Sequence, residues 1–161
     1  MVGAKELNGL LNRIGNFDSV QFTNDFDKRL ILQKTVYLLQ AFGLNIGYRY
    51  SWYLRGPYSP ELAHTAYSVA ENFDSQLVVQ FTESKSERRF EEFLSFIKNK
   101  KDDQYCLEAI ASIHFLAKLY GEKNEQLIYD EVKQKVGQML KEEFICLWNE
   151  LWQNGLLDKK I

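Results

Sequence analysis

Apolar residues recur at helical spacing along most of the chain. In residues 4–15 one such stripe consists of Leu7, Leu10, Leu11 and Ile14. Gly15 follows the stripe, and this layout is typical of an amphipathic helix with a glycine stop. Similar patterns predict further helices over residues 24–43, 59–73, 83–101, 102–121, 124–137 and 140–157. The chain is therefore expected to be mainly helical.

Residues 24–43 have the broadest apolar surface of these helices. Apolar side chains surround most of the circumference, so we expect this to be the buried central helix. Asn24 or Asp25 is a candidate N-cap, and Gly43 is the expected stop. A narrow polar strip remains on one side, with members three to four residues apart: Arg29, Gln33, Tyr37 and Gln40.

Two short segments favour extended structure. Residues 48–54 are rich in aromatic side chains, and residues 75–81 read SQLVVQF, so both are predicted to be strands and to form a pair. The predicted fold class is α+β and mainly helical, namely a compact helical domain with a short two-stranded sheet.

Both prolines of the chain lie in residues 54–61, which read LRGPYSPE. Pro57 fixes its own φ angle and biases Gly56 away from the helical region, so we expect a turn. Ser59 suits the N-cap of the next helix, and Pro60 suits its first position, where a missing N–H costs nothing. The glutamate that follows complements the helix dipole.

The composition is that of an ordinary soluble globular protein. Of the 161 residues, 45% are hydrophobic and 26% are charged, which excludes a disordered chain. We expect residues 1–161 to form a single domain, with residues 98–103 as the best candidate for a seam between two halves. No apolar run approaches the ~20 residues that span a bilayer, and no signal-peptide pattern is present. A cytoplasmic location is therefore the expectation.

The charge is distributed unevenly. From Lys28 to Pro60 the chain has five basic residues and no Asp or Glu, although the net charge is −2. This local basic character predicts that an anionic partner would meet that segment. A well-buried segment that simply lacks acids is an equally good interpretation.

No motif in the sequence indicates catalysis. A glycine-rich phosphate loop, a nucleophile elbow and metal-ligand spacing are all missing. His114 lies on a mostly apolar helix and is expected to be packed and hydrogen-bonded, whereas His64 suits a solvated helix face. Cys106 and Cys146 are isolated, so we expect free, buried thiols. The prediction is a protein that is not an enzyme and has no cofactor and no metal.

Two stretches carry a resemblance to a known family. The residues RLILQKTVYLLQAFG and then YSWYLRGPYSPELAHTAYSV resemble the signature of the uncharacterised YwgA-like proteins, and are more distantly similar to the SocA-like or Panacea antitoxin domain. The resemblance covers residues 28–70 well and the rest loosely. It implies a compact helix-rich fold with winged-helix-like elements and no known catalytic activity. AENFDSQLVV departs from the pattern, since a tight Gly-Leu-Ile strand entry is expected there.

The first functional hypothesis is a protein-interaction module, such as an antitoxin-like or adaptor domain. The aromatic cluster in residues 48–58, together with Arg49, suits a binding hot spot. The turn places Arg55 beside a helix start, an arrangement that can receive a carboxylate or phosphate. The candidate partner-binding residues are Arg55, Tyr58, Ser59, Gln33, Lys34 and Tyr37. In the alternative interpretation Arg55 pairs with an internal acid and Tyr58 only packs.

The second hypothesis is a winged-helix DNA-binding regulator. Residues 147–160, LWNELWQNGLLDKK, look like a recognition helix that leads into a wing. That helix would present several carboxylates to phosphates, which is unfavourable. Trp148 and Trp152 are expected to seal the core instead. DNA is therefore ranked second to a protein partner. The oligomeric state stays open, with a homodimer as one alternative.

Overall fold

The computed structural model describes residues 1–161. It contains eight α-helices, one 3-10 turn and one two-stranded sheet, so the α+β and mainly helical class is confirmed. In chain order the elements are α1 (Ala4–Ile14), α2 (Ser19–Asn24), α3 (Phe26–Ala41), β1 (Ser51–Tyr53), β2 (Gly56–Tyr58), α4 (Pro60–Glu71), α5 (Ser84–Ile97), α6 (Gln104–Tyr120), η1 (Glu122–Asn124), α7 (Glu125–Val136) and α8 (Lys141–Gln153).

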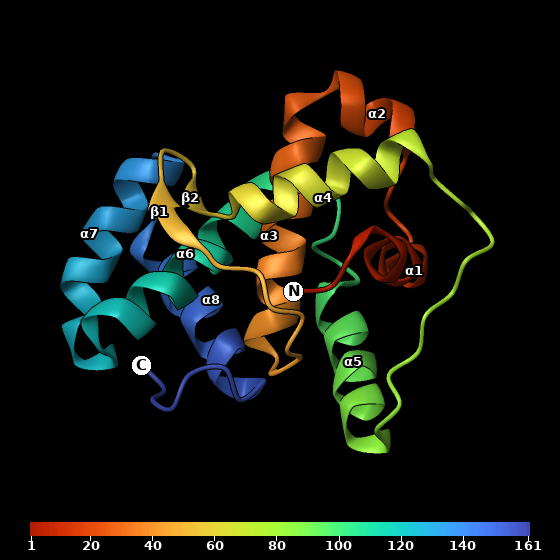
Figure 1. Cartoon of the computed structure of the whole chain (residues 1–161). Helices are drawn as coiled ribbons and strands as arrows, with labels where there is room; N and C mark the ends of the chain where they lie inside the picture. The colour runs from red at the N-terminus through yellow and green to blue at the C-terminus, as the bar shows by residue number, and fades with distance from the viewer.

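Helix α3 runs through the middle of the molecule, with α6, α7 and α8 on one side and α1 and α5 on the other (Figure 1). All residues from Leu30 to Leu39 are buried, which confirms the central position that its apolar circumference predicts. The carboxylate of Asp25 accepts a hydrogen bond from the N–H of Asp27 and caps the helix. Sequence analysis missed the short helix α2, which ends at this extended aspartate.

The hydrophobic core is one cluster of 37 buried residues, and every α-helix contributes to it. Helix α6 is the second main contributor, with Leu107, Ile110, Ile113 and Leu116 completely buried against α3 and the C-terminal helices. The proposed seam at residues 98–103 is a short turn between α5 and α6. Because the cluster contains residues from both sides of this turn, burial of apolar surface joins the two halves.

The sheet is a hairpin, and its second strand is not the predicted one. Strand β1 pairs antiparallel with β2, with Trp52 opposite Pro57. The predicted strand 75–81 forms no strand and lies beside α1 instead. Two neighbouring segments joined by a tight turn lose little chain entropy on pairing, which favours the local partner. Gly56 makes the turn possible because its φ of 93° is unfavourable for other residues.

The start of α4 follows the prediction. The hydroxyl oxygen of Ser59 accepts a hydrogen bond from the N–H of Leu62, and Pro60 occupies the first helical turn. Ser59 is completely buried, so this cap is part of the core. The two prolines therefore fix a hairpin strand and then begin a helix.

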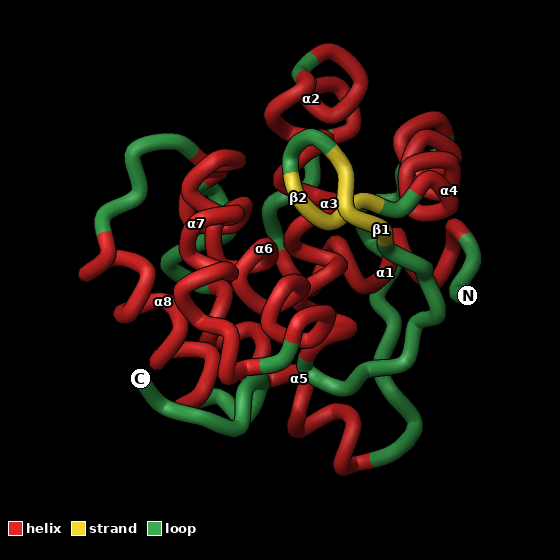
Figure 2. The backbone as a smooth tube through the Cα atoms, turned by 90° about the vertical axis from the view of Figure 1, so that its left-hand side faces the viewer, coloured by secondary structure: helices red, strands yellow, loops and turns green.

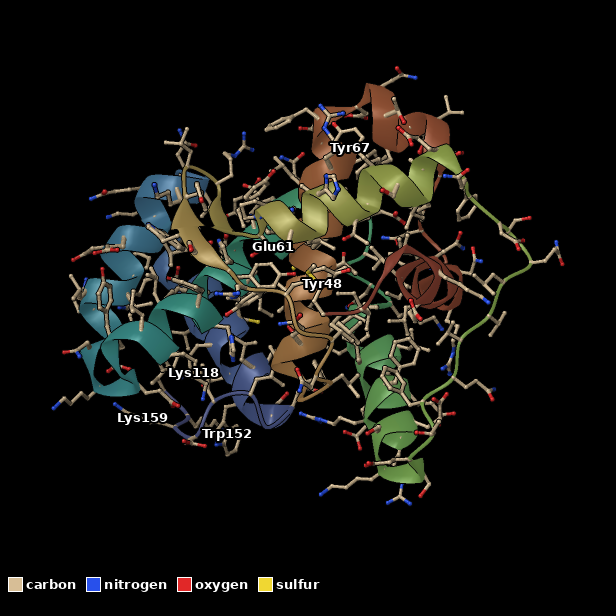
Figure 3. All side chains as sticks on the ribbon, in the orientation of Figure 1. Tyr48, Glu61, Tyr67, Lys118, Trp152 and Lys159 are labelled. Atoms are coloured by element: carbon tan, nitrogen blue, oxygen red, sulfur yellow. The ribbon has the colours of Figure 1, made fainter.

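Both cysteines are free as expected, but Cys146 is exposed and Cys106 only half-buried, so their predicted burial is wrong. Trp148 is completely buried, whereas Trp152 is more than one-third exposed and points outward at the end of α8 (Figure 3). Trp152 therefore does not seal the core.

No helix of the protein is both long enough and apolar enough to cross a membrane.

Candidate interaction surface at the hairpin

The polar strip of α3 holds the hairpin and the start of α4. The side-chain amide of Gln33 donates to the carbonyl of Ser59 at 2.8 Å and accepts from its N–H at 2.9 Å. The ammonium group of Lys34 donates to the carbonyl of Pro57 at 2.6 Å. Both side chains are buried. Since buried backbone groups must be paired, these contacts fix the chain where β2 passes into α4.

The backbone of the hairpin turn approaches α6 closely. A Cβ atom at Gly56 would lie 2.5 Å from the hydroxyl oxygen of Ser112 and 3.7 Å from the ammonium nitrogen of Lys34. Burial lowers the pKa of Lys34 to about 8, with Glu108 acting in the opposite direction and Arg55 reinforcing the decrease. The Ser112 hydroxyl has no hydrogen-bond partner. The hairpin thus covers a small buried polar cluster.

Arg55 pairs with an internal acid. Its guanidinium group lies 3.0 Å from the carboxylate of Glu108 on α6. The Glu108 side chain is 6% exposed, whereas the Arg55 side chain is 43% exposed. The pair fastens the turn to α6, as in the alternative interpretation of the sequence. The exposed part of the guanidinium group still faces solvent.

Tyr37 is also buried, and its contacts are internal. Its hydroxyl oxygen is 2.7 Å from Nδ1 of His114, and its ring packs edge-on against Tyr50. Burial lowers the pKa of His114 to about 4, and Lys118 contributes in the same direction. The neutral imidazole can accept a hydrogen bond at Nδ1. His114 is therefore packed and hydrogen-bonded, as the sequence predicted.

The N-terminus of α4 is occupied by the protein's own groups. Ser59 caps the helix and also donates from its hydroxyl to the carboxylate of Glu61 at 3.1 Å. The backbone N–H of Glu61 and this hydroxyl lower the pKa of the Glu61 carboxyl. Figure 3 shows Glu61 at this end of α4. The carboxylate of Glu61 thus occupies the N-terminus of α4, where we expected an anionic group of a partner to bind.

The tip of the hairpin exposes two large apolar or aromatic side chains. Leu54 at the turn is 84% exposed and Tyr53 is 48% exposed, although turn positions usually carry polar residues. The ring of Tyr53 packs edge-on against Tyr58, with ring centroids 5.3 Å apart. In Figure 2 the yellow hairpin stands at the surface between α2, α4 and α7.

A small apolar pocket lies next to Tyr58. It has a volume of about 80 Å³ and lies between α2, α3 and α4. Seven of its nine lining residues are hydrophobic, and they include Phe26 and Tyr67, which are both exposed. Figure 3 shows Tyr67 on α4 at the side of α2. Arg29 is the one charged residue in the lining. The pocket extends the apolar surface of the hairpin.

The basic segment from Lys28 to Pro60 is not a continuous cationic face. Lys34 is buried and Arg55 is paired with Glu108. Arg29 donates to the backbone carbonyls of Phe22 and Thr23 at the end of α2. Three of the five cations are thus engaged inside the protein, which favours the interpretation of a buried segment without acids.

The structure brings the six predicted site residues together but buries four of them. Lys34, Gln33, Tyr37 and Ser59 have internal partners and are buried. Arg55 and Tyr58 are the members that solvent reaches. Sequence reasoning included Tyr53 only as a member of the aromatic cluster in residues 48–58, and it missed Leu54 and Glu108. An acid on the mostly apolar helix α6 was a usable signal for Glu108, because a buried carboxylate needs a partner.

The segment after α8 contains no strand. The hairpin lies between α3 and α4, so the wing of the DNA-binding hypothesis is not found after the expected recognition helix. Within residues 1–161, no group of three or more His, Cys, Asp or Glu side chains could hold a metal ion.

No protein-family model, curated protein or solved structure matches the chain. The geometry of the chain itself therefore carries the functional proposal.

Proposed function

We propose that the protein is a non-catalytic, regulatory interaction module that binds a protein partner with the tip of the β1–β2 hairpin. The contact residues are Tyr53, Leu54, Arg55 and Tyr58. The observation that carries the proposal is an exposed leucine and tyrosine on a hairpin that buried polar bonds hold in place. A contact surface fixed in advance loses little entropy when it binds.

Three internal contacts support the rigidity of this surface. Lys34 donates a hydrogen bond to the carbonyl of Pro57, and Arg55 forms an ion pair with Glu108. The ring of Trp52 in β1 stacks on Phe115 of α6, with centroids 5.8 Å apart. The turn is thus attached to both α3 and α6. Its side chains project from a fixed base, as in binding sites that are preorganised by their surroundings.

The chemistry of the surface indicates the kind of partner. Leu54 and the pair of tyrosines offer an apolar and aromatic contact, and such residues dominate the energy of protein interfaces. The solvent-facing part of Arg55 can bind a carboxylate of the partner. We therefore infer a protein segment with an apolar anchor beside an acidic residue. The resemblance to YwgA-like proteins and to the Panacea antitoxin domain favours the same class of function.

Photo-crosslinking tests this proposal directly. A photoreactive amino acid replaces Leu54 in the protein expressed in its native cell. Leu119 on α6 is the matched control, since it is also an exposed leucine, at 59%. We expect one dominant protein adduct from position 54 and none of that mass from position 119. Adding Tyr53→Ala should reduce the adduct at least ~5-fold, because aromatic hot-spot residues contribute most.

The Tyr53→Ala variant should fold normally, because the ring is half exposed and lies outside the hydrophobic core. A melting temperature within ~3 °C of the parent protein checks this. Equal labelling from positions 54 and 119, or an adduct that Tyr53→Ala leaves unchanged, contradicts the proposed surface.

A further inference from the structure

Residues 77–81 form an extended segment without a partner strand. The stretch runs from the end of α4 to the start of α5 and bows outward at the edge of the molecule (Figure 1). Leu77, Val79 and Phe81 are half-buried, whereas the intervening Val78 and Gln80 are exposed. This alternation has the period of two that is typical of a β-strand with one buried face. The segment thus has the side-chain pattern of a strand but none of its pairing.

Side chains of α1 and α5 occupy the inner edge of this segment. Asn12 donates to the carbonyl of Leu77 at 2.6 Å, and Arg13 donates to the carbonyl of Val79 at 3.3 Å. Glu87 accepts from the N–H of Phe81 at 2.9 Å. Gly9 permits the close approach, since a Cβ atom there would collide with Val79. Polar side chains therefore replace a neighbouring strand on this side.

The outer edge of the segment is unpaired. Successive backbone groups of an extended chain point in opposite directions, so the groups of Val78 and Gln80 point away from α1. Their two N–H and two C=O groups make no hydrogen bond within the protein. Four unpaired backbone groups in a row are a template for another strand.

The usual protection of an exposed edge is missing here. Native proteins place charged residues, proline or a β-bulge on such edges to prevent pairing between chains. Residues 75–82 contain no charged residue and no proline. Val78 is a strand-favouring residue at 59% exposure. The composition therefore favours pairing with a further strand.

We propose that residues 77–81 pair antiparallel with the same residues of a second copy of this chain, with the two-fold axis at Val79. In this register Val78 lies opposite Gln80 of the second copy, and Gln80 lies opposite Val78 of the second copy. Each opposed pair exchanges two N–H···O=C bonds, as in the hydrogen-bonded pairs of an antiparallel ladder. The result is four backbone bonds that use all the free groups of Val78 and Gln80.

The same register also matches the apolar side chains. Val79 meets Val79 of the second copy as a close, non-hydrogen-bonded pair, and Leu77 meets Phe81 of the second copy. Among pairings of two copies, only the register centred on Val79 uses every free group of Val78 and Gln80 and also brings apolar side chains opposite one another. This self-complementarity, in a segment without charges that would repel a copy of itself, favours a second copy as the occupant. Isologous contacts of this kind close into a dimer.

This inference does not depend on the proposed function of the hairpin. Residues 77–81 and the hairpin lie at opposite edges of the molecule in Figure 1. A change at Val78 should therefore leave the photo-adduct of Leu54 unaffected. Failure of one proposal can be told apart from failure of the other.

Sedimentation equilibrium of the full chain over a range of concentrations tests the dimer. We expect a reversible monomer–dimer equilibrium that Val78→Pro weakens at least ~10-fold, because proline lacks the N–H that two of the four bonds require. Val78→Thr is the matched control, which keeps the N–H and the strand preference. It should dimerise like the parent chain. Val78→Pro should melt within ~3 °C of the parent, since this N–H has no internal partner.

Amide exchange gives a second measurement on the unchanged chain. The amides of Val78 and Gln80 should exchange more slowly as the protein concentration rises. A chain that stays monomeric up to ~1 mM overturns the proposal. A dimer that Val78→Pro leaves intact, or amides of Val78 and Gln80 that never slow down, overturns it as well. If Val78→Pro fails to fold, the amide measurement decides.

Discussion

At the scale of single residues, buried polar side chains decide how the hairpin is held. Lys34 binds the backbone carbonyl of Pro57 in β2, and Gln33 binds that of Ser59 just after it. The carboxylate of Glu108 binds Arg55. Each of these groups would be costly to bury alone, because a lost partner leaves an unsatisfied donor, acceptor or charge. With their partners in place, these side chains fix the position of the hairpin relative to α3 and α6.

His114 should make the protein sensitive to mild acid. Its folded-state pKa is about 4, whereas the ordinary value is 6.5. Between these values the unfolded chain binds a proton that the folded chain does not, so stability falls as the pH decreases from 6.5 to 4. The expected loss between pH 7 and pH 5 is about 2 kcal/mol. Urea unfolding at both pH values measures it.

The control for this pH effect is His114→Gln. Its amide can still accept a hydrogen bond from Tyr37, but it does not titrate. The variant should lose clearly less stability than the parent between pH 7 and pH 5. An equal loss in both proteins would show that other groups cause the acid sensitivity.

Arg55 and Glu108 should be coupled in stability. Arg55→Ala leaves a buried carboxylate without its closest cation, which we expect to cost about 1–2 kcal/mol, less than a fully buried pair because Arg55 is partly exposed. Adding Glu108→Gln should recover most of this loss. A double-mutant cycle from urea unfolding measures the coupling. Additive effects of the two substitutions would argue that the pair contributes nothing to the fold.

At the scale of elements, the hairpin and α4 act as one unit attached to α3 and α6. Gln33 binds both backbone groups of Ser59, the residue that ends the hairpin and caps α4. Trp52 and Arg55 attach the other side of the hairpin to α6. A two-stranded hairpin is marginal by itself, so these attachments explain why so short a sheet is ordered.

The hairpin turn requires glycine for two separate reasons. Gly56 has a φ of 93° and little space, since a Cβ atom would lie 2.5 Å from the Ser112 hydroxyl. Gly43 has the same φ of 93° but no atom within 4 Å. Both Gly→Ala changes should cost about 1 kcal/mol for the backbone conformation. Gly56→Ala should cost a further ~1–3 kcal/mol for overpacking.

Urea unfolding of the two variants separates backbone strain from crowding. The difference between Gly56→Ala and Gly43→Ala is the crowding contribution. Ser112→Ala combined with Gly56→Ala should reduce this difference, because it removes the crowding hydroxyl. Equal destabilisation by Gly43→Ala and Gly56→Ala would mean that the turn has room to move away from α6.

At the scale of the whole molecule, the distribution of charge supports the proposed protein partner over DNA. The chain has a net charge of −2, and three of the five cations in its basic segment are engaged internally. Helix α8 carries Glu142 and Glu143 in its first turn. A phosphate backbone requires several free cations on one face, and the basic segment from Lys28 to Pro60 does not offer them.

Duplex DNA should therefore bind weakly and without sequence preference. We expect a dissociation constant in the micromolar range or weaker at ~150 mM salt, measured in a mobility-shift assay. Lys28→Ala, which removes a cation without an internal partner, should change it less than ~3-fold. A nanomolar, sequence-dependent complex would instead promote the DNA-binding hypothesis.

Local patterns in the sequence were sufficient for every helix except the short α2, and for the start of α4. Apolar periodicity located α1, α3 and the helices from α5 to α8, because a helix that buries one face must repeat apolar residues every three to four positions. The prolines and Ser59 located the start of α4, because capping depends on neighbouring residues alone. The buried histidine followed from its apolar surroundings on one helix.

Only the tertiary structure decided which segments meet. Residues 75–81 have the composition of a strand, but strand formation needs a partner, and the chain pairs β1 with the adjacent β2 instead. The six candidate site residues do come together, yet burial separates Arg55 and Tyr58 from the four that the core encloses. Burial of a side chain, and whether a distant strand is available for residues 75–81, depend on contacts between residues far apart in the chain, and a local pattern does not contain them.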